Sequence, residues 1–224
     1  MNKLNHIAFI MDGNGRWGLK KKKNRNYGHL AGVQTVQKIV EASIEFKVPI
    51  ISFYVFSTEN WRRPKTEIKY LFKLINIYFN KEIKNIIKNN IKIIVSGRTN
   101  KLPVKIKNTL KIAMNKTKKN NKLIVNLAIN YGSKAEIIDA IKKINKSSKR
   151  ITEENIEKNL YLQEPFPDIL VRTGGQKRLS NFMLWQLSYS EIFFFEKLWP
   201  DFTKKDLRNV INKYQKVKRN FGSI

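Results

Sequence analysis

Short apolar runs, each about as long as a strand, recur along the chain and alternate with longer mixed segments. The first run, residues 7–11, is apolar at every position, as expected for a buried strand of a mostly parallel sheet. The second, residues 50–56, is rich in residues that favour extended backbone. The predicted strands span residues 7–11, 50–56, 91–95, 123–129, 168–171 and 191–195.

Helical periodicity fills most of the segments between these runs. The longest pattern ends near residue 87 and has a wide, aromatic-rich apolar face, with Thr66 as its expected N-cap. Thr152, followed by two glutamates, predicts the start of a short helix. Further helices are predicted over residues 30–44, 103–118, 134–144 and 203–219. This alternation predicts a single α/β domain over residues 1–224, with a mostly parallel central sheet of about six strands and helices on both faces.

A polar loop follows the first strand, at the edge where open α/β sheets bind ligands. It reads Asp12-Gly13-Asn14-Gly15-Arg16. Gly13 and Gly15 can adopt positive φ and expose backbone N–H groups, which together with Arg16 suit a phosphate. Asp12 suits a hard divalent cation such as Mg²⁺. An ordinary Asp-Gly turn is the alternative.

Basic and polar residues continue this first loop through residue 26. Arg25 and His29 extend the predicted anion site, because His29 is expected to open the next helix, where the helix dipole favours anions. A structural histidine is the alternative. We expect the lysines of residues 20–23 to form a solvated, mobile segment.

The loop after the second strand is unusually dense in polar side chains. Ser57, Glu59, Asn60, Trp61 and Arg63 lie between a buried strand and a proline. Trp61 either contacts a ligand or fills the core. An amide is a poor base, so Asn60 is expected to orient a substrate or a water.

The loop after the fifth strand predicts a second anion site. Arg172 and Arg178 flank a Gly-Gly turn, and Ser180 follows two residues later, an arrangement that suits a diphosphate. A basic surface loop is the alternative. Glu191 begins the sixth predicted strand, where its carboxylate either caps the sheet edge or reaches a metal.

Known nucleotide-binding signatures are missing from the sequence. There is no G-x-x-x-x-G-K-[ST] motif, and the glycine loop at residues 13–16 lacks the third glycine of G-x-G-x-x-G. Two anion sites, one or two metal carboxylates and many apolar residues nearby therefore predict an amphipathic diphosphate substrate.

The amino-acid composition excludes several kinds of site but does not by itself indicate a function. The chain has no cysteine, which excludes disulfides, zinc thiolate sites and cysteine nucleophiles. No window predicts a membrane span and the N-terminus does not resemble a signal peptide, so we expect a soluble, cytoplasmic protein. The net charge of +28 suggests nucleic acid, an anionic membrane surface or a polyanionic substrate. Genome-wide drift toward lysine and asparagine codons is an alternative origin.

The combination of motifs resembles the cis-prenyltransferase family, and within it the bacterial undecaprenyl diphosphate synthases. The similar segments run from the first strand to the last helix, so the resemblance covers nearly the whole chain. They are residues 6–17, 27–32, 56–64, 126–132, 172–186 and 198–202.

The resemblance implies a homodimeric, Mg²⁺-dependent enzyme that adds isopentenyl diphosphate to an allylic diphosphate such as farnesyl diphosphate, forming cis double bonds. It implies Asp12 and Asn60 as catalytic residues and Asp12 and Glu191 as metal ligands. The substrate-binding positions that it implies are Gly13, Asn14, Gly15, Arg16, Trp17, Arg25, His29, Ser57, Thr58, Glu59, Asn60, Trp61, Arg63, Arg172, Arg178, Leu179 and Ser180. The product implied is a long polyprenyl diphosphate, as a lipid-carrier precursor for cell-wall glycans, released with transient membrane-surface contact.

An apolar tunnel is expected for the growing chain, with Phe72, Ile75, Phe79, Val125 and Leu127 as candidate wall residues. The sequence also departs from the family pattern. Gln176-Lys177 replaces a common Glu-His pair, and Ser133-Lys134 replaces Gly-Arg. A nucleic-acid-binding α/β protein and a catalytically weak scaffold subunit are the rival interpretations, although no nucleic-acid motif is present and nucleic acid is not an expected partner.

Overall fold

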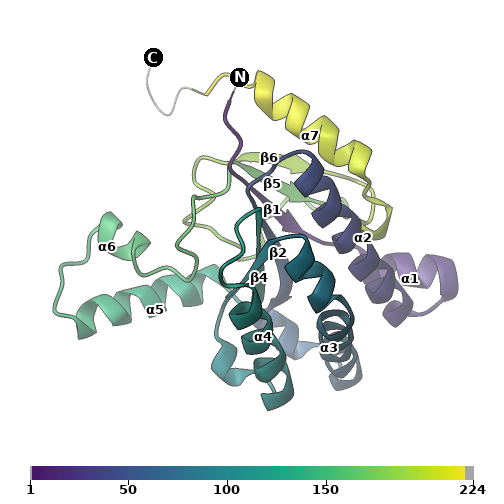
Figure 1. Cartoon of the computed structure of the whole chain (residues 1–224), viewed down its shortest axis with the longest axis horizontal. Coiled ribbons are helices and arrows are strands. Elements are labelled where there is room, and N and C mark those ends of the chain that lie inside the picture. Colours follow the sequence, from purple (N-terminus) through teal and green to yellow (C-terminus); the bar gives the residue numbers. More distant parts are fainter. Residues whose placement is uncertain (1, 220–224) are drawn as a thin grey trace.

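The computed structural model describes residues 2–219, which form one sheet flanked by helices (Figure 1). The strands are β1 (His6–Ile10), β2 (Ile50–Ser57), β3 (Ile91–Ser96), β4 (Leu123–Tyr131), β5 (Ile169–Arg172) and β6 (Glu191–Phe194). The α-helices are α1 (Asn14–Lys22), α2 (Arg25–Glu45), α3 (Lys65–Lys88), α4 (Val104–Thr117), α5 (Ser133–Lys146), α6 (Glu153–Glu157) and α7 (Lys204–Lys216). Short 3₁₀ helices are η1 (Thr58–Arg62), η2 (Thr99–Lys101) and η3 (Trp199–Asp201).

The six strands of the described chain pair in parallel, in the order β3-β4-β2-β1-β5-β6. The central strand β1 pairs with both β2 and β5. After β1 the chain crosses one face through α2, whereas after β5 it crosses the opposite face, where Phe182 packs. The carboxyl ends of β1 and β5 therefore form a switch point, which is where such sheets bind ligands.

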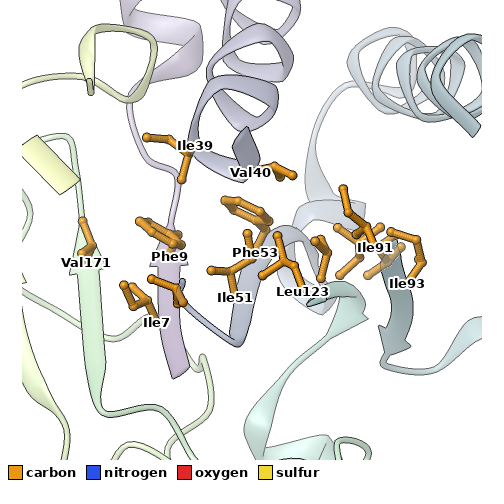
Figure 2. Packing of buried hydrophobic residues seen from close by; sticks show 14 of the residues in the cluster. Ile7, Phe9, Ile39, Val40, Ile51, Phe53, Ile91, Ile93, Leu123 and Val171 are labelled. Carbon is orange, nitrogen blue, oxygen red and sulfur yellow. The ribbon is translucent and has the colours of Figure 1, made fainter. Parts of the chain in front are cut away.

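Two apolar layers cover the sheet. On one face, the side chain of Phe9 and its neighbours pack beneath Ile39 and Val40 of α2 (Figure 2). Residues of α3, α4 and α7 complete this layer. The other face carries Ala8 and is covered by Phe182 and its neighbours in the long connection between β5 and β6. Helices α5 and α6 lie beyond that connection and share a smaller apolar cluster (Figure 1).

The predicted strands are all present, with ends shifted by at most one or two residues. Three helix boundaries were predicted wrongly. Thr66 lies inside the first turn of α3, because that helix begins directly after the extended residue Pro64. The last helix ends at Lys216 rather than at residue 219, because Val217 is extended. His29 does not open its helix: α2 begins one turn earlier, at Arg25, where the side chain of Asn24 caps it.

The expected loop over residues 14–22 is instead helix α1, and this corrects the prediction of a mobile segment at residues 20–22. The sequence pattern did not predict this helix because the segment contains several glycines, and glycine disfavours helix. They are required by packing: a Cβ on Gly28 would lie 1.8 Å from the carbonyl oxygen of Asn14, so α1 and α2 could not approach. Gly13 does have positive φ, at 110°. Gly15 is helical instead, and a Cβ there would lie 2.6 Å from the Arg25 guanidinium carbon.

Candidate active site

A cavity of about 810 Å³ lies against the carboxyl ends of β1 and β5 and extends between the sheet and helices α2 and α3. Its polar end contains Asp12 and several arginines. The remaining wall is apolar and includes Val33, Val36, Val40, Leu71, Leu74, Ile75, Tyr78, Phe79, Ile86, Ile91, Ile93, Val125, Leu127 and Ile129. At 1.5 Å per residue, the stretch of α3 from Leu71 to Ile86 is about 22 Å long. The cavity is therefore long enough to hold an extended hydrocarbon chain.

The expected tunnel wall overlaps this cavity. Ile75, Phe79, Val125 and Leu127 all line it. Phe72 packs instead against the rings of Phe56 and Trp61, behind the wall.

Asp12 lies just past the end of β1, where its carboxylate accepts hydrogen bonds from two arginines. Arg172 Nη2 donates to Oδ2 at 3.0 Å, and Arg16 Nη2 donates to Oδ1 at 3.2 Å. The backbone carbonyl of Asp12 accepts from the Thr173 hydroxyl at 2.8 Å and from the Trp199 N–H at 3.0 Å. These bonds fix the loop, while the Asp12 side chain stays 30% exposed toward the cavity.

Arg172, Arg178 and Ser180, here called the Arg172 cluster, lie on the β5 side of Asp12. The Arg172 side chain is only 4% exposed. Its Nη1 donates to the Ser180 hydroxyl at 2.8 Å and to the backbone carbonyl of Arg178. Its Nε is buried with no hydrogen-bond partner among the residues described. Arg178 is exposed and donates to Gln176 at 2.6 Å. All three cluster residues, which form the predicted second anion site, line the cavity.

Helix α1 presents its amino terminus at the same end of the cavity. Gly13, Asn14, Gly15 and Arg16 line the wall. First-turn N–H groups have no partner within their own helix, and the helix dipole makes this end positive. Arg16 is held across the cavity mouth by a 2.7 Å hydrogen bond to the Gly174 carbonyl. The side-chain oxygen of Asn14 is buried without a partner among the residues described. This arrangement suits an anion beside Asp12.

A second group of cations lies on the other side of Asp12 and surrounds Glu67. Arg25 donates to Glu67 through Nε at 3.1 Å and Nη2 at 3.3 Å. Arg63 Nη1 lies 3.1 Å from the carboxylate and His29 Nε2 lies 3.2 Å from it. We call Arg25, His29, Arg63 and Glu67 the Glu67 cluster. Arg25, His29 and Arg63 line the cavity, whereas Glu67 lies behind them and is 7% exposed.

The titration behaviour of this cluster follows from burial and from its charges. Burial lowers the pKa of His29 below 6.5, against the opposing charge of Glu67, so the imidazole is neutral at pH 7. Because Nε2 faces a carboxylate, that nitrogen carries the proton. Burial acts to raise the pKa of Glu67, but the hydrogen bond and charge of Arg25, with those of Arg63, lower it overall. Glu67 is therefore ionised at neutral pH.

The polar segment after β2 is a 3₁₀ helix, η1, rather than an open loop. The Asn60 side-chain oxygen accepts from the Ser57 backbone N–H at 3.1 Å and so caps η1. Ser57, Glu59, Asn60 and Arg63 line the cavity. The side-chain N–H₂ group of Asn60 can donate hydrogen bonds to a ligand.

Four predicted substrate residues lie outside the cavity wall. The Trp17 ring stacks on Tyr27, and its Nε1 donates to Asp201 at 2.7 Å. Trp61 Nε1 donates to Asn130 at 2.7 Å, so this side chain anchors η1. The Thr58 hydroxyl donates to Glu59 at 3.1 Å, and Leu179 packs against the core on the second sheet face.

Glu191 is not brought together with Asp12 within this chain. It begins β6 in register with Ile169, at the amino end of the strands. Asp12 follows the carboxyl end of β1, where Ile10 pairs with Arg172. Residues 2–219 contain no cluster of three or more His, Asp or Glu side chains that could hold a metal ion. Among the described residues, Asp12 and Glu59 are the carboxylates that line the cavity.

Two residues with structural roles in the site, Glu67 and Asn181, were not among the predicted site residues. Glu67 lies in a helix whose apolar face dominated the pattern. Asn181 donates to Glu59 at 2.8 Å and accepts from the Lys134 N–H at 2.9 Å, which joins η1 to α5. Its φ of 62° is in the left-handed region, where asparagine is enriched, but a single sequence gives no signal of that conformation.

The fold places a polar cavity end, rich in arginines, beside a long apolar wall, and comparison with known proteins identifies the family. Residues 10–222 match the family model described as "Putative undecaprenyl diphosphate synthase". The chain is 46% identical to an isoprenyl transferase from Fusobacterium nucleatum over 98% of this chain and 96% of the relative. An isoprenyl transferase from Rickettsia bellii is also 46% identical, over 99% of both chains.

Solved structures agree with these sequence relatives. A probable undecaprenyl diphosphate synthase from Campylobacter jejuni superposes with a TM-score of 0.87 at 38% identity, covering all of both chains. Lavandulyl diphosphate synthase from Lavandula x intermedia, solved with dimethylallyl diphosphate, superposes with a TM-score of 0.93 at 28% identity over 98% of both. The chain therefore belongs to the undecaprenyl diphosphate synthase family of cis-prenyltransferases, also called isoprenyl transferases, as its motifs predicted.

Proposed function

We propose that the protein condenses isopentenyl diphosphate units onto farnesyl diphosphate with cis geometry. The proposed product is undecaprenyl diphosphate, a lipid-carrier precursor for cell-wall glycans. One observation carries the proposal: two cation clusters lie on opposite sides of Asp12, at the polar end of a long apolar cavity. Two diphosphates and one hydrocarbon chain fit that arrangement chemically.

The allylic diphosphate is assigned to the side of the cavity formed by α1 and the Glu67 cluster. The N–H groups of the first α1 turn bind its oxygens, supported by Arg16 and Arg25. This site lies next to the apolar wall of α2 and α3, so the attached hydrocarbon can enter the cavity. The ligand of the lavender relative, dimethylallyl diphosphate, is an allylic diphosphate of this kind.

Isopentenyl diphosphate is assigned to the Arg172 cluster. Arg178 is exposed and free to turn toward a ligand, and the Ser180 hydroxyl can donate a hydrogen bond. Arg172 is already held by Asp12 and Ser180, so it supplies a fixed positive charge. Lys177 is exposed nearby, and its ammonium group would add positive charge rather than ligate a metal.

The donor set fits Mg²⁺. Mg²⁺ is commonly held by one or two carboxylates together with substrate phosphates and waters, and Asp12 supplies one partly exposed carboxylate beside the proposed allylic site. When bound, the ion would neutralise charge that develops on the leaving diphosphate. Asp12 is the residue of this chain that would hold it.

In the proposed reaction the allylic carbon–oxygen bond breaks and diphosphate leaves. The α1 amide groups, Arg16 and Arg25 stabilise the departing negative charge, because they are positioned before the reaction begins. The isopentenyl double bond attacks the allylic carbon, and the resulting cation loses one proton to an oxygen of the departed diphosphate. Asn60 orients the isopentenyl diphosphate through its N–H₂ group, because its oxygen is bonded to Ser57. The apolar wall excludes water from the cation.

We assign the control of product length to the residues at the inner end of the cavity. Ile86 lies near the carboxyl end of α3 and Ile91 begins β3, so both line the cavity at the end opposite the carboxyl ends of the strands. We expect Ile86→Ala to lengthen the main product, because it opens space where the growing chain stops. Ile138→Ala, at an exposed position on α5, is the control and should leave product length unchanged. Chromatography of the dephosphorylated products measures both.

A homodimer, cytoplasmic location and transient membrane contact complete the proposal. Strand β6 is an edge of the sheet and exposes Ile192 and Phe194, at 41% and 38%, on one side. An apolar edge strand favours a covering partner, and a second copy would provide one. Sedimentation of wild type and Phe194→Lys tests this: the variant should shift from dimer to monomer. No helix among residues 2–219 has the length and apolarity needed to cross a membrane.

The direct test is an extraction assay with labelled isopentenyl diphosphate, farnesyl diphosphate and Mg²⁺. Label should enter the butanol phase with wild type and be lost with EDTA. Asp12→Ala should also abolish it, whereas Glu154→Gln, on an exposed surface ion pair, should not. If folded wild type transfers no label to any allylic primer, the proposed function is wrong.

A further inference from the structure

Glu67 is a buried carboxylate that holds three side chains of the cavity wall without lining the cavity itself. One of its oxygens, Oε1, accepts from Arg25, His29 and Arg63 together, and Oε2 accepts a second hydrogen bond from Arg25. The three donors come from two segments, the start of α2 and the residue after η1. A single carboxylate therefore sets the positions of three groups that face the proposed allylic diphosphate.

The location of Glu67 keeps its carboxylate ionised and fixed. It is the third residue of α3, where the positive end of the helix dipole favours a negative charge. Arg25 and Arg63 donate to the same oxygen, so their guanidinium groups lie close together and would repel each other without it. Both side chains are about half or one-third exposed, at 48% and 36%, and long exposed side chains lose their order readily.

We propose that Glu67 is a positioning residue that orders Arg25, His29 and Arg63 for the diphosphate of the allylic substrate and couples that site to η1. The coupling follows from connectivity: Arg63 immediately follows η1, which carries Asn60, while Arg25 and His29 belong to α2. This inference rests on the proposed function, because it assigns the Glu67 cluster to the allylic substrate.

Two possible roles for Glu67 predict opposite changes in diphosphate affinity when its carboxylate is removed. If Glu67 only reduced the positive charge, its loss would add one positive charge beside the site and tighten diphosphate binding. If it positions the cations, its loss disorders them and weakens binding despite the gain in charge. Loss of even one charge-assisted hydrogen bond typically weakens an interaction about tenfold or more, so we expect binding to weaken at least about tenfold.

The experiment compares Glu67→Gln with Glu82→Gln. Glu82 is the matched control, because it lies on the same helix, is 8% exposed and lies outside the cavity wall. Calorimetric titration with inorganic diphosphate measures binding without turnover. Steady-state assays measure the KM for farnesyl diphosphate and for isopentenyl diphosphate.

Glu67→Gln should weaken the binding of inorganic diphosphate and raise the KM for farnesyl diphosphate, each by at least about tenfold. The KM for isopentenyl diphosphate should change less than about threefold. Glu82→Gln should match wild type.

Glu67→Asp separates positioning from folding. It keeps the charge but shortens the side chain by one methylene group, so it should bind diphosphate more weakly than wild type and more tightly than Glu67→Gln. If Glu67→Gln does not fold, the comparison of Glu67→Asp with wild type decides the question. Unchanged or tighter diphosphate binding by the folded variants would overturn the proposal. A wild type that binds diphosphate but transfers no prenyl group would refute the proposed function instead, and the binding comparison would still test Glu67.

Discussion

The two cation clusters beside Asp12 are organised in different ways. In the Glu67 cluster, a carboxylate behind the wall holds Arg25, His29 and Arg63 and leaves Asp12 uninvolved. In the Arg172 cluster, the buried arginine is held by Asp12 itself. The difference indicates that the Glu67 cluster is built independently of Asp12, whereas the Arg172 cluster depends on it. Changes at Asp12 should therefore disturb the positions of the Arg172 cluster more than those of the Glu67 cluster.

The largest effect is expected for Asp12→Asn. This substitution removes the proposed Mg²⁺ ligand and the counter-ion of Arg172, which is 4% exposed. We expect kcat to fall by roughly 10³-fold or more, because the loss of a preorganised electrostatic group alone costs about 10²–10³-fold. Rapid-quench single-turnover assays measure the chemical step. Inorganic diphosphate should still bind the Glu67 cluster, and loss of that binding would contradict the separation of the two clusters.

The next largest effect is expected for Arg172→Lys, and Arg25→Lys is the variant with which it is compared. A lysine cannot reproduce the bonds that Arg172 makes with Asp12, Ser180 and the Arg178 carbonyl. We expect Arg172→Lys to lower kcat/KM for isopentenyl diphosphate about 100-fold, consistent with the loss of two charge-assisted hydrogen bonds. Arg25→Lys should instead raise mainly the KM for farnesyl diphosphate. Equal effects of both variants on both substrates would show that the clusters are not distinct.

The smallest effect concerns pH and is confined to one cluster. His29 is neutral at pH 7 because its pKa is lowered, so acidification adds positive charge to the Glu67 cluster. We expect the farnesyl diphosphate KM to decrease modestly, about threefold, as the pH is lowered below 6.5, where His29 gains its proton. His29→Gln should abolish that decrease. A decrease that persists in His29→Gln would assign it to another group.

The second histidine serves as an internal reference for that titration. Burial lowers the pKa of His6 to about 4, and its ring bonds the Pro165 carbonyl and Ser52. A buried neutral histidine binds fewer protons in the native state than in the unfolded state. Stability is therefore full above pH 6.5 and falls as the pH drops toward 4. NMR of the two imidazoles should show only His29 responding to Glu67→Gln, with its pKa lowered further.

The strands and the site loops could be predicted from the sequence because their signals are local. An apolar run ending at Asp12 marks a buried strand and its polar end, and parallel topology then brings Arg172 to the same edge. Helix α1 was missed because the glycines that permit its close packing against α2 are also poor helix formers. Packing between two helices is a tertiary property, so no local pattern reports it.

The remaining differences between the predicted and the observed site depend on where side chains point. Trp17 and Trp61 lie in segments rich in polar residues, yet their indole N–H groups are bonded to Asp201 and Asn130 outside the cavity. Glu191 carries a carboxylate, but it is at the opposite end of its strand from Asp12. Glu67 was overlooked because its partners are dispersed along the sequence and meet only when α2, η1 and α3 pack together.

The most direct test of two separate diphosphate sites is an equilibrium titration in EDTA, where turnover is not expected. Farnesyl diphosphate is titrated into protein that is saturated with isopentenyl diphosphate. Two organised clusters predict that one farnesyl diphosphate binds per chain without displacing labelled isopentenyl diphosphate. Displacement of the label in proportion to the farnesyl diphosphate bound would show a single shared site and contradict the assignment of the two clusters.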